Sequence, residues 1–155
     1  MEFIVEYTDK IHIGDPIYIN KEESFSYDPW LKCDFSIMIG KGYNSLNVDL
    51  TSGVVVHMSG LNSNFIWKLG IVQPPNARNG LLKIKITDSM IPGIGITYAD
   101  DWNTVYDRQS GWIQIGDCCQ IRETQFVTFA HETIAAIKRG KLKAIWIKPK
   151  MIDLN

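Results

Sequence analysis

Short runs in which apolar and polar side chains alternate constrain this fold more than any other feature of the sequence. Residues 45–50 (SLNVDL) and 81–87 (LLKIKIT) each place their apolar side chains on one side and their polar ones on the other. A period of two is that of a β-strand with one buried face. Turn residues at 51–53 and 79–80 punctuate these runs. We therefore expect an antiparallel meander in the middle of the chain.

A third run, residues 65–72 (FIWKLGIV), shows the same period. It would place four apolar side chains on one strand face. These are Phe65, Trp67, Leu69 and Ile71.

The last third of the chain predicts a strand, a helix and a second strand. Residues 111–117 (GWIQIGD) and 142–149 (LKAIWIKP) are strand-like. Between them, Ala130, Ile134 and Ile137 recur at helical spacing, which predicts a helix over residues 130–139. Gly140, which follows, is typical of a helix C-terminus.

These segments, with a possible second short helix in residues 22–30, predict an α+β fold. We expect a mostly antiparallel β-sheet with one or two packed helices. The chain has 155 residues, 45% of them apolar and 21% charged, so it fits a single globular domain covering residues 1–155. It has no apolar stretch of about 18 residues and no signal-peptide pattern, so we expect no membrane span and a cytoplasmic location.

Charge is segregated along a chain whose net charge is only −1. Residues 1–34 and 88–107 are acidic, whereas residues 126–150 contain six basic residues and one acidic residue. These blocks can pair with each other in the fold, or they can create a field for a charged partner. The near-neutral total argues against a nucleic-acid partner.

The sequence contains no catalytic or metal-binding motif that we can identify. His12, His57 and His131 stand apart, without HxH or HExxH spacing, and the cysteines form no CxxC pair. We therefore expect no cofactor, no metal, no catalytic residues and no enzymatic activity. One alternative is a thiol-dependent hydrolase in which Cys118 or Cys119 pairs with His131.

A second alternative uses the basic C-terminal face. Lys141, Lys143 and Lys148 would lie near Trp146, as in a nucleic-acid or small-ligand binding module that stacks bases on an aromatic ring. These lysines would otherwise form the solvent-exposed face of a strand.

Two segments combine acidic and aromatic residues, a composition that favours protein binding. The segments are residues 98–107 and 26–30. Tyr and Trp provide a large rigid contact area, while carboxylates attract a basic partner. The predicted partner-binding residues are Asp100, Asp101, Trp102, Tyr106 and Asp107, with Tyr27, Asp28 and Trp30 as a second patch.

The C-terminal segment resembles small bacterial immunity proteins of contact-dependent growth inhibition and related polymorphic toxin systems. The resemblance covers about forty residues, and its markers are Gly111, Trp112, Gly116, Trp146 and Pro149. It implies a non-enzymatic protein that binds a cognate toxin domain, often a basic nuclease, and blocks it. It assigns no individual contact residue and leaves the oligomeric state open.

Overall fold

The computed structural model, in which residues 1–118 and 121–153 are described, is built almost entirely of β-strands. The described residues form no α-helix, and the helical structure among them is one 3-10 turn, η1 (Asn64–Ile66). The first strands are β1 (Phe3–Tyr7), β2 (Asp15–Ile19), β3 (Ser24–Asp28), β4 (Phe35–Ile39), β5 (Tyr43–Asp49), β6 (Val54–Leu61), β7 (Lys68–Leu69) and β8 (Arg78–Ile84). The remaining strands are β9 (Gly95–Ala99), β10 (Thr104–Tyr106), β11 (Ile113–Gly116), β12 (Thr124–Ala130), β13 (Thr133–Lys138), β14 (Lys141–Ile147) and β15 (Lys150–Ile152).

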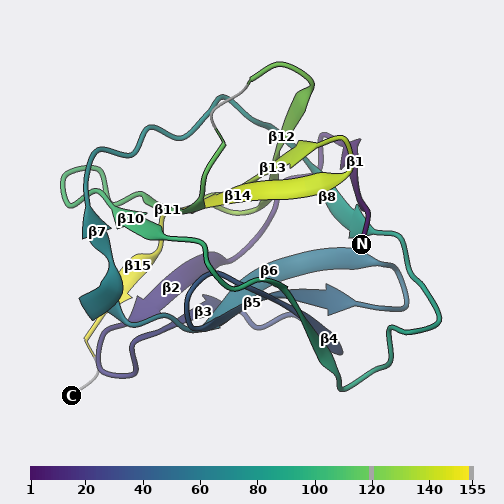
Figure 1. Ribbon diagram of the computed structural model, residues 1–155, viewed down its shortest axis with the longest axis horizontal. Helices are drawn as coiled ribbons and strands as arrows, with labels where there is room; N and C mark the ends of the chain where they lie inside the picture. Colours follow the sequence, from purple (N-terminus) through teal and green to yellow (C-terminus); the bar gives the residue numbers. More distant parts are fainter. Residues whose placement is uncertain (119–120, 154–155) are drawn as a thin grey trace.

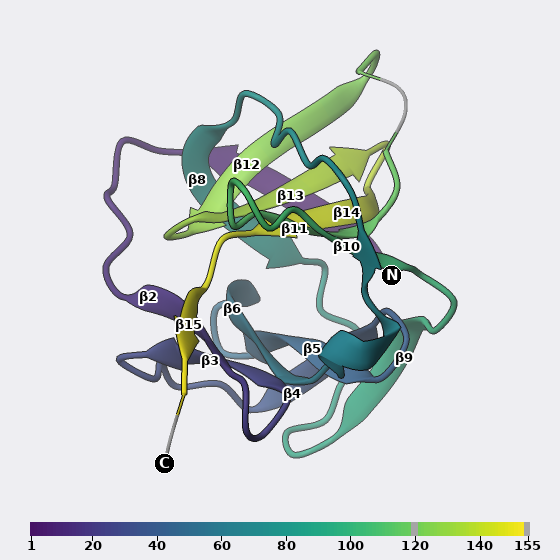
Figure 2. The same cartoon turned by 90° about the vertical axis from the view of Figure 1, so that its left-hand side faces the viewer.

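The strands form one curled, mixed sheet, a half-barrel. Its main path runs β15-β2-β3-β6-β8-β12-β13-β14-β11-β10-β7, with β5, β4 and β9 continuing from β6 and β1 pairing with β8. The sheet folds over itself, so that β2–β6 form one layer and β11–β14 form the facing layer (Figures 1 and 2). Most pairings are antiparallel, but β4·β9, β7·β10, β8·β12 and β2·β15 are parallel.

The main core fills the space between the two layers. Ile37 and Leu46 come from the β4–β5 layer, and Ile115 and Ile145 come from the facing layer; all four are fully buried. A smaller second core lies on the outer side of β13 and β14. It contains Val72, Ile134, Ala136, Ala144 and Trp146.

The predicted helix over residues 130–139 is wrong. Residues 124–147 form three antiparallel strands, and β12, β13 and β14 meet at two-residue turns. Ala135 and Ile137 point into the main core, whereas Ile134 and Ala136 point into the second core. Burial of both faces gives a continuous apolar run, which can imitate helical spacing.

The second predicted helix, in residues 22–30, is wrong as well, because β3 occupies most of it. The α+β fold class is therefore corrected to an almost all-β fold. The strand predictions for residues 45–50, 81–87, 111–117 and 142–149 overlap β5, β8, β11 and β14, although β8 ends at Ile84.

Candidate partner-binding surface

A ridge of exposed apolar side chains follows β6 in the sequence. Phe65 and Ile71 expose 89% and 86% of their surface, and Ile66 and Leu69 expose about half of theirs. We call these four side chains the apolar ridge. Large apolar side chains gathered on one exposed segment mark interaction sites more often than isolated ones do.

Trp67 explains why its neighbours point outward. Its ring packs 4.7 Å from the ring of Tyr18 and 5.4 Å from that of Tyr106, and its indole Nε1 donates a 2.9 Å hydrogen bond to Asn62 Oδ1. The preceding 3-10 turn and the two-residue β7 break the strand period. The prediction that residues 65–72 form one strand with a single buried face is therefore wrong, because Trp67 alone of its four residues turns inward.

A hollow of about 500 Å³ lies beside the apolar ridge, where the two ends of the sheet path meet. We call it the seam hollow. Leu69 of β7 and Met151 of β15, the terminal strands of the path, both line it. Its other lining residues are Asn20, Asn64, Phe65, Trp67, Tyr106 and Arg108. Tyr106, one of the predicted residues, is thus partly buried at the inner side of this hollow.

A second hollow, of about 470 Å³, lies on the other side of β7. We call it the acidic hollow, because Asp101 and Asp117 line it together with Lys68. Successive side chains of a strand alternate between its two faces, so Lys68 faces the acidic hollow while Leu69 faces the seam hollow. The short β7 strand therefore joins two hollows into one surface.

Trp102 packs inward from the loop before β10. Its ring lies edge-on to Tyr98, with ring centroids 6.0 Å apart, and rests on the backbone of Gly116. A Cβ at Gly116 would lie 2.8 Å from the Trp102 ring, so glycine is required there. Trp102 thus forms a wall of the acidic hollow and holds the adjacent Asp100 and Asp101 at the surface, where both are exposed.

Asp107 is a turn residue whose carboxylate is already bonded. Oδ2 accepts the Val72 N–H at 3.1 Å, and Oδ1 accepts the Gln109 and Ser110 N–H groups at 3.0 and 3.3 Å. The Val72 hydrogen bond is the main reason that the pKa of Asp107 lies below its usual range. Asp107 is only 9% exposed, so it supports the neighbouring loops rather than presenting a charge.

The second predicted patch is divided between surface and interior. Tyr27 is buried, and its hydroxyl donates a 2.6 Å hydrogen bond to the Ile13 carbonyl. Burial raises the pKa of this hydroxyl. Asp28 is exposed and precedes a cis peptide bond to Pro29. Trp30 is 55% exposed, and its ring lies 4.3 Å from that of His57.

His57 lies at the centre of a buried polar network that the sequence did not reveal. Its ring is 0% exposed and is held between Trp30 and Tyr27, whose ring centroid is 5.2 Å away. Nε2 accepts the Leu31 N–H at 3.3 Å, and the Asn47 amide lies 3.1 Å from Nδ1. Burial lowers the pKa of His57 to about 4, so the ring is neutral at pH 7.

The Leu31 bond fixes the tautomer of this ring. Because Nε2 accepts a hydrogen bond, the neutral imidazole carries its proton on Nδ1. That proton needs an acceptor, so the Asn47 amide must turn its oxygen toward the ring. The Ser45 and Ser59 hydroxyls beside Asn47 can both donate and accept, and they satisfy the amide in this orientation.

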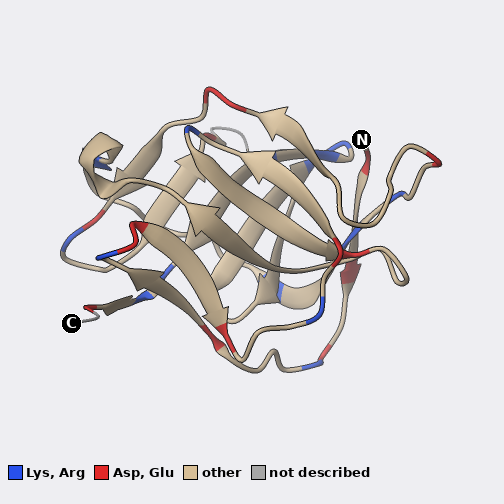
Figure 3. Ribbon diagram, turned by 90° about the horizontal axis from the view of Figure 1, so that it is seen from below, with Lys and Arg blue, Asp and Glu red and all other residues tan. Residues whose placement is uncertain are grey.

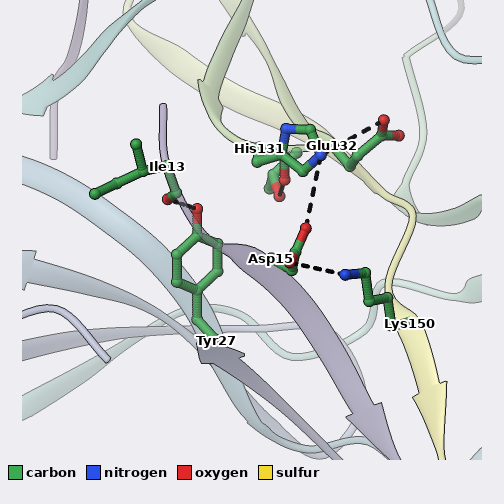
Figure 4. A network of polar contacts seen from close by, with 7 residues as sticks. Ile13, Asp15, Tyr27, His131, Glu132 and Lys150 are labelled. Carbon is green, nitrogen blue, oxygen red and sulfur yellow. Dashed lines mark hydrogen bonds and ion pairs between the residues drawn. The ribbon is translucent and has the colours of Figure 1, made fainter. Parts of the chain in front are cut away.

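The segregated charges pair in part with each other. Asp15 Oδ2 accepts a 2.8 Å bond from Lys150 Nζ, and this bond is the main reason that the pKa of Asp15 is lowered. His131 Nε2 lies 3.8 Å from Asp15 Oδ1 and 3.9 Å from Glu132 Oε1 (Figure 4). The network joins the β12–β13 turn to β2 and β15.

Acidic and basic residues otherwise lie mostly in loops and at strand ends (Figure 3). Lys83 forms a further 2.8 Å ion pair with Glu6, across the β1–β8 pairing. Among the described residues, no group of three or more His, Cys, Asp or Glu side chains is placed to hold a metal ion.

The side chains predicted for a nucleic-acid or small-ligand binding module and for a thiol-dependent hydrolase are either far apart or buried. Trp146 is buried and its Nε1 donates to Gln114 Oε1, so its ring cannot stack on a base at the surface. Cys118 packs against the second core, and Cys119 lies outside the described residues. His131 instead faces Asp15 and Glu132.

The chain matches no protein-family model and no curated protein sequence. Within residues 1–118 and 121–153, no helix has the length and apolar character needed to cross a membrane.

Sequence reasoning missed the apolar ridge and Arg108. The signal was present in residues 65–72, where four large apolar side chains surround a single tryptophan. These side chains are exposed because β7 is only two residues long. The length of β7 depends on its pairing with β10, which is distant in sequence, so local sequence patterns do not reveal it.

Proposed function

We propose that this protein acts by binding another protein, and that the partner is a toxin domain with a basic surface, which this chain neutralises as an immunity protein. The observation that carries the proposal is the apolar ridge, of which Phe65 and Leu69 line the seam hollow, while Lys68 in the same segment lines the acidic hollow. An exposed apolar surface of this kind, beside aromatic and arginine side chains, has the composition of a protein interface.

The two parts of this surface have different physical roles. The exposed Asp100 and Asp101 attract a basic partner over a distance of about one Debye length and raise the association rate. Phe65 and Leu69 lose their contact with water when the partner docks, which slows dissociation. Fast capture and slow release are what an antidote to a toxin requires.

The resemblance of residues 111–149 to immunity proteins supports the choice of a toxin as partner. It rests on the marker residues alone, since the segment between them forms strands rather than a helix. Gly116 is the marker closest to the proposed surface, because the backbone there supports the Trp102 ring.

The test uses the C-terminal domain of the protein encoded immediately upstream of this chain. Co-expression with that domain should restore growth, and titration calorimetry should give a dissociation constant in the nanomolar range, on the order of 10⁻⁷–10⁻¹⁰ M. The informative variant is Asp100→Lys with Asp101→Lys. Asp107 is left unchanged because its loss would disturb the turn.

The matched control is Asp9→Lys with Asp88→Lys, which changes the net charge equally at two other exposed positions. The Asp100/Asp101 variant should associate about tenfold more slowly at low salt, with the difference fading at high salt. The control should keep most of the wild-type rate. A domain that is not bound, or that remains toxic when co-expressed, would refute the proposal.

A further inference from the structure

We infer that the seam hollow is the anchor pocket of the interface and takes an apolar side chain that is followed by a carboxylate, both from an extended segment of the partner. This inference rests on the proposed protein-binding function and gives its contact chemistry.

The hollow lies between the two terminal strands of the main sheet path. The sheet path ends at β15 on one side and at β7 on the other, and Met151 and Leu69 bring those ends to the same hollow. Figure 1 shows β7 and β15 at the same end of the molecule. A volume of about 500 Å³ falls in the range of binding pockets, about 300–1,000 Å³.

The inner side of the hollow is aromatic and fixed. Trp67 and Tyr106 meet edge-to-face with ring centroids 5.4 Å apart, and the Asn62 side chain holds the indole Nε1 at 2.9 Å. Leu69 and Phe65 lie at the exposed rim. A partner side chain that enters would contact rigid rings, which cost little conformational entropy on binding.

Arg108 is the only charged residue that lines the hollow within the described part of the chain. It is exposed and forms no ion pair with any described residue. The carboxylate of the adjacent Asp107 accepts three backbone N–H groups and forms no ion pair with Arg108. A guanidinium at the rim of an apolar pocket favours a planar carboxylate, which it can bind through two hydrogen bonds.

The charges of the ridge segment favour a partner protein over a second copy of this chain, docked ridge to ridge, as the occupant. Arg108 on one side of β7 favours an acidic group, and Asp101 on the other side favours a basic group. The exposed ridge itself carries Lys68 and no carboxylate between Asn64 and Ile71, so a second copy would bring no acidic group in its own ridge to Arg108.

The first arm of the test uses blocked hexapeptides and the isotope-labelled full chain, followed by NMR. The probe has a central Phe-Asp pair, and its two matched comparators have Phe-Lys and Ser-Asp at the same positions. The Phe-Asp peptide should shift the amide signals of Leu69, Gly70 and Arg108, and it should bind about tenfold more tightly than either comparator. Arg108→Gln should abolish the preference for Asp over Lys.

Absence of shifts at these residues up to millimolar peptide, or equal shifts from all three peptides, would overturn the inference. Sedimentation of the chain alone tests whether a second copy of the chain occupies the hollow instead. A dimer that Leu69→Ser converts to a monomer would show that a second copy fills the hollow, and would also overturn it.

The second arm separates this inference from the proposed function. If the toxin domain binds the wild-type chain and binds Arg108→Gln and Leu69→Ser equally well, the hollow is not the anchor while the function stands. If the peptides bind as expected and the toxin domain does not, the hollow stands and the function fails. Both variants change exposed side chains, and their thermal midpoints report whether the fold is kept.

Discussion

Protonation of His57 should make the protein acid-sensitive well above the range in which carboxylates titrate. The folded state lowers the pKa of His57 to about 4, whereas the unfolded chain has the ordinary value of 6.5. Between these values the unfolded chain binds the proton more tightly, so stability falls as the pH falls from 6.5 to 4. The main structural cause is burial of the ring, which disfavours its charged form. Protonation would also remove the Nε2 lone pair that accepts the Leu31 N–H.

The size of the effect follows from the two pKa values. Linkage gives a loss of about 2 kcal/mol between pH 7 and pH 5, and about 3 kcal/mol below pH 4. For a chain of this length, 2 kcal/mol corresponds to a fall of about 4–8 °C in the thermal midpoint.

The assay is urea unfolding at a series of pH values for the wild type and for His57→Gln. The variant should be less stable at pH 7, because the packing between Tyr27 and Trp30 changes, but its stability should vary much less between pH 7 and pH 5. Parallel pH profiles for the two proteins would refute the reasoning, because the titrating group would then not be His57.

Two further predictions concern glycine and turn positions. Gly116→Ala should lower stability by about 2 kcal/mol or more, because φ is +86° and the new Cβ would lie 2.6 Å from the Lys143 carbonyl oxygen. Gly93→Ala is the control for backbone strain alone, since Gly93 has a φ of +85° and no atom within 4 Å of the new Cβ. Equal losses of stability in the two variants would contradict the packing argument. Arg139→Asn should raise stability by only about 0.3 kcal/mol in urea unfolding. Asn tolerates the positive φ of 51° at this position of a two-residue hairpin, but the exposed ion pair between Arg139 and Glu123 is lost. A loss above about 1 kcal/mol, more than an exposed ion pair contributes, would contradict the hairpin.

The strands in which apolar and polar residues alternate could be predicted from the sequence, whereas β13, a continuous apolar run, could not. In β8, Leu82 and Ile84 are buried while Leu81 and Lys83 are partly exposed, so the period of two is visible. In β13 every residue from Thr133 to Ile137 is buried, because the second core covers the outer face. The loop around Val72 buries this outer face and is far from β13 in sequence, so the local apolar pattern cannot reveal it.

The composition of residues 98–107 predicts a binding surface, and four residues of this segment line the acidic hollow. It could not show that Asp107 would bond to three N–H groups or that Trp102 would rest on Gly116, since those partners come from other loops and strands. The sequence predicts Tyr27 as a contact residue, but Tyr27 is buried, and its hydroxyl is bonded to the loop that contains Ile13.

Hydrogen–deuterium exchange of the chain with and without the upstream toxin domain tests the central claim most directly. The account predicts slower exchange on binding at residues 61–71 and 100–108, with no change in the β12–β13 hairpin. Protection confined to the hairpin or to the basic residues of β14, with residues 61–71 unaffected, would contradict it.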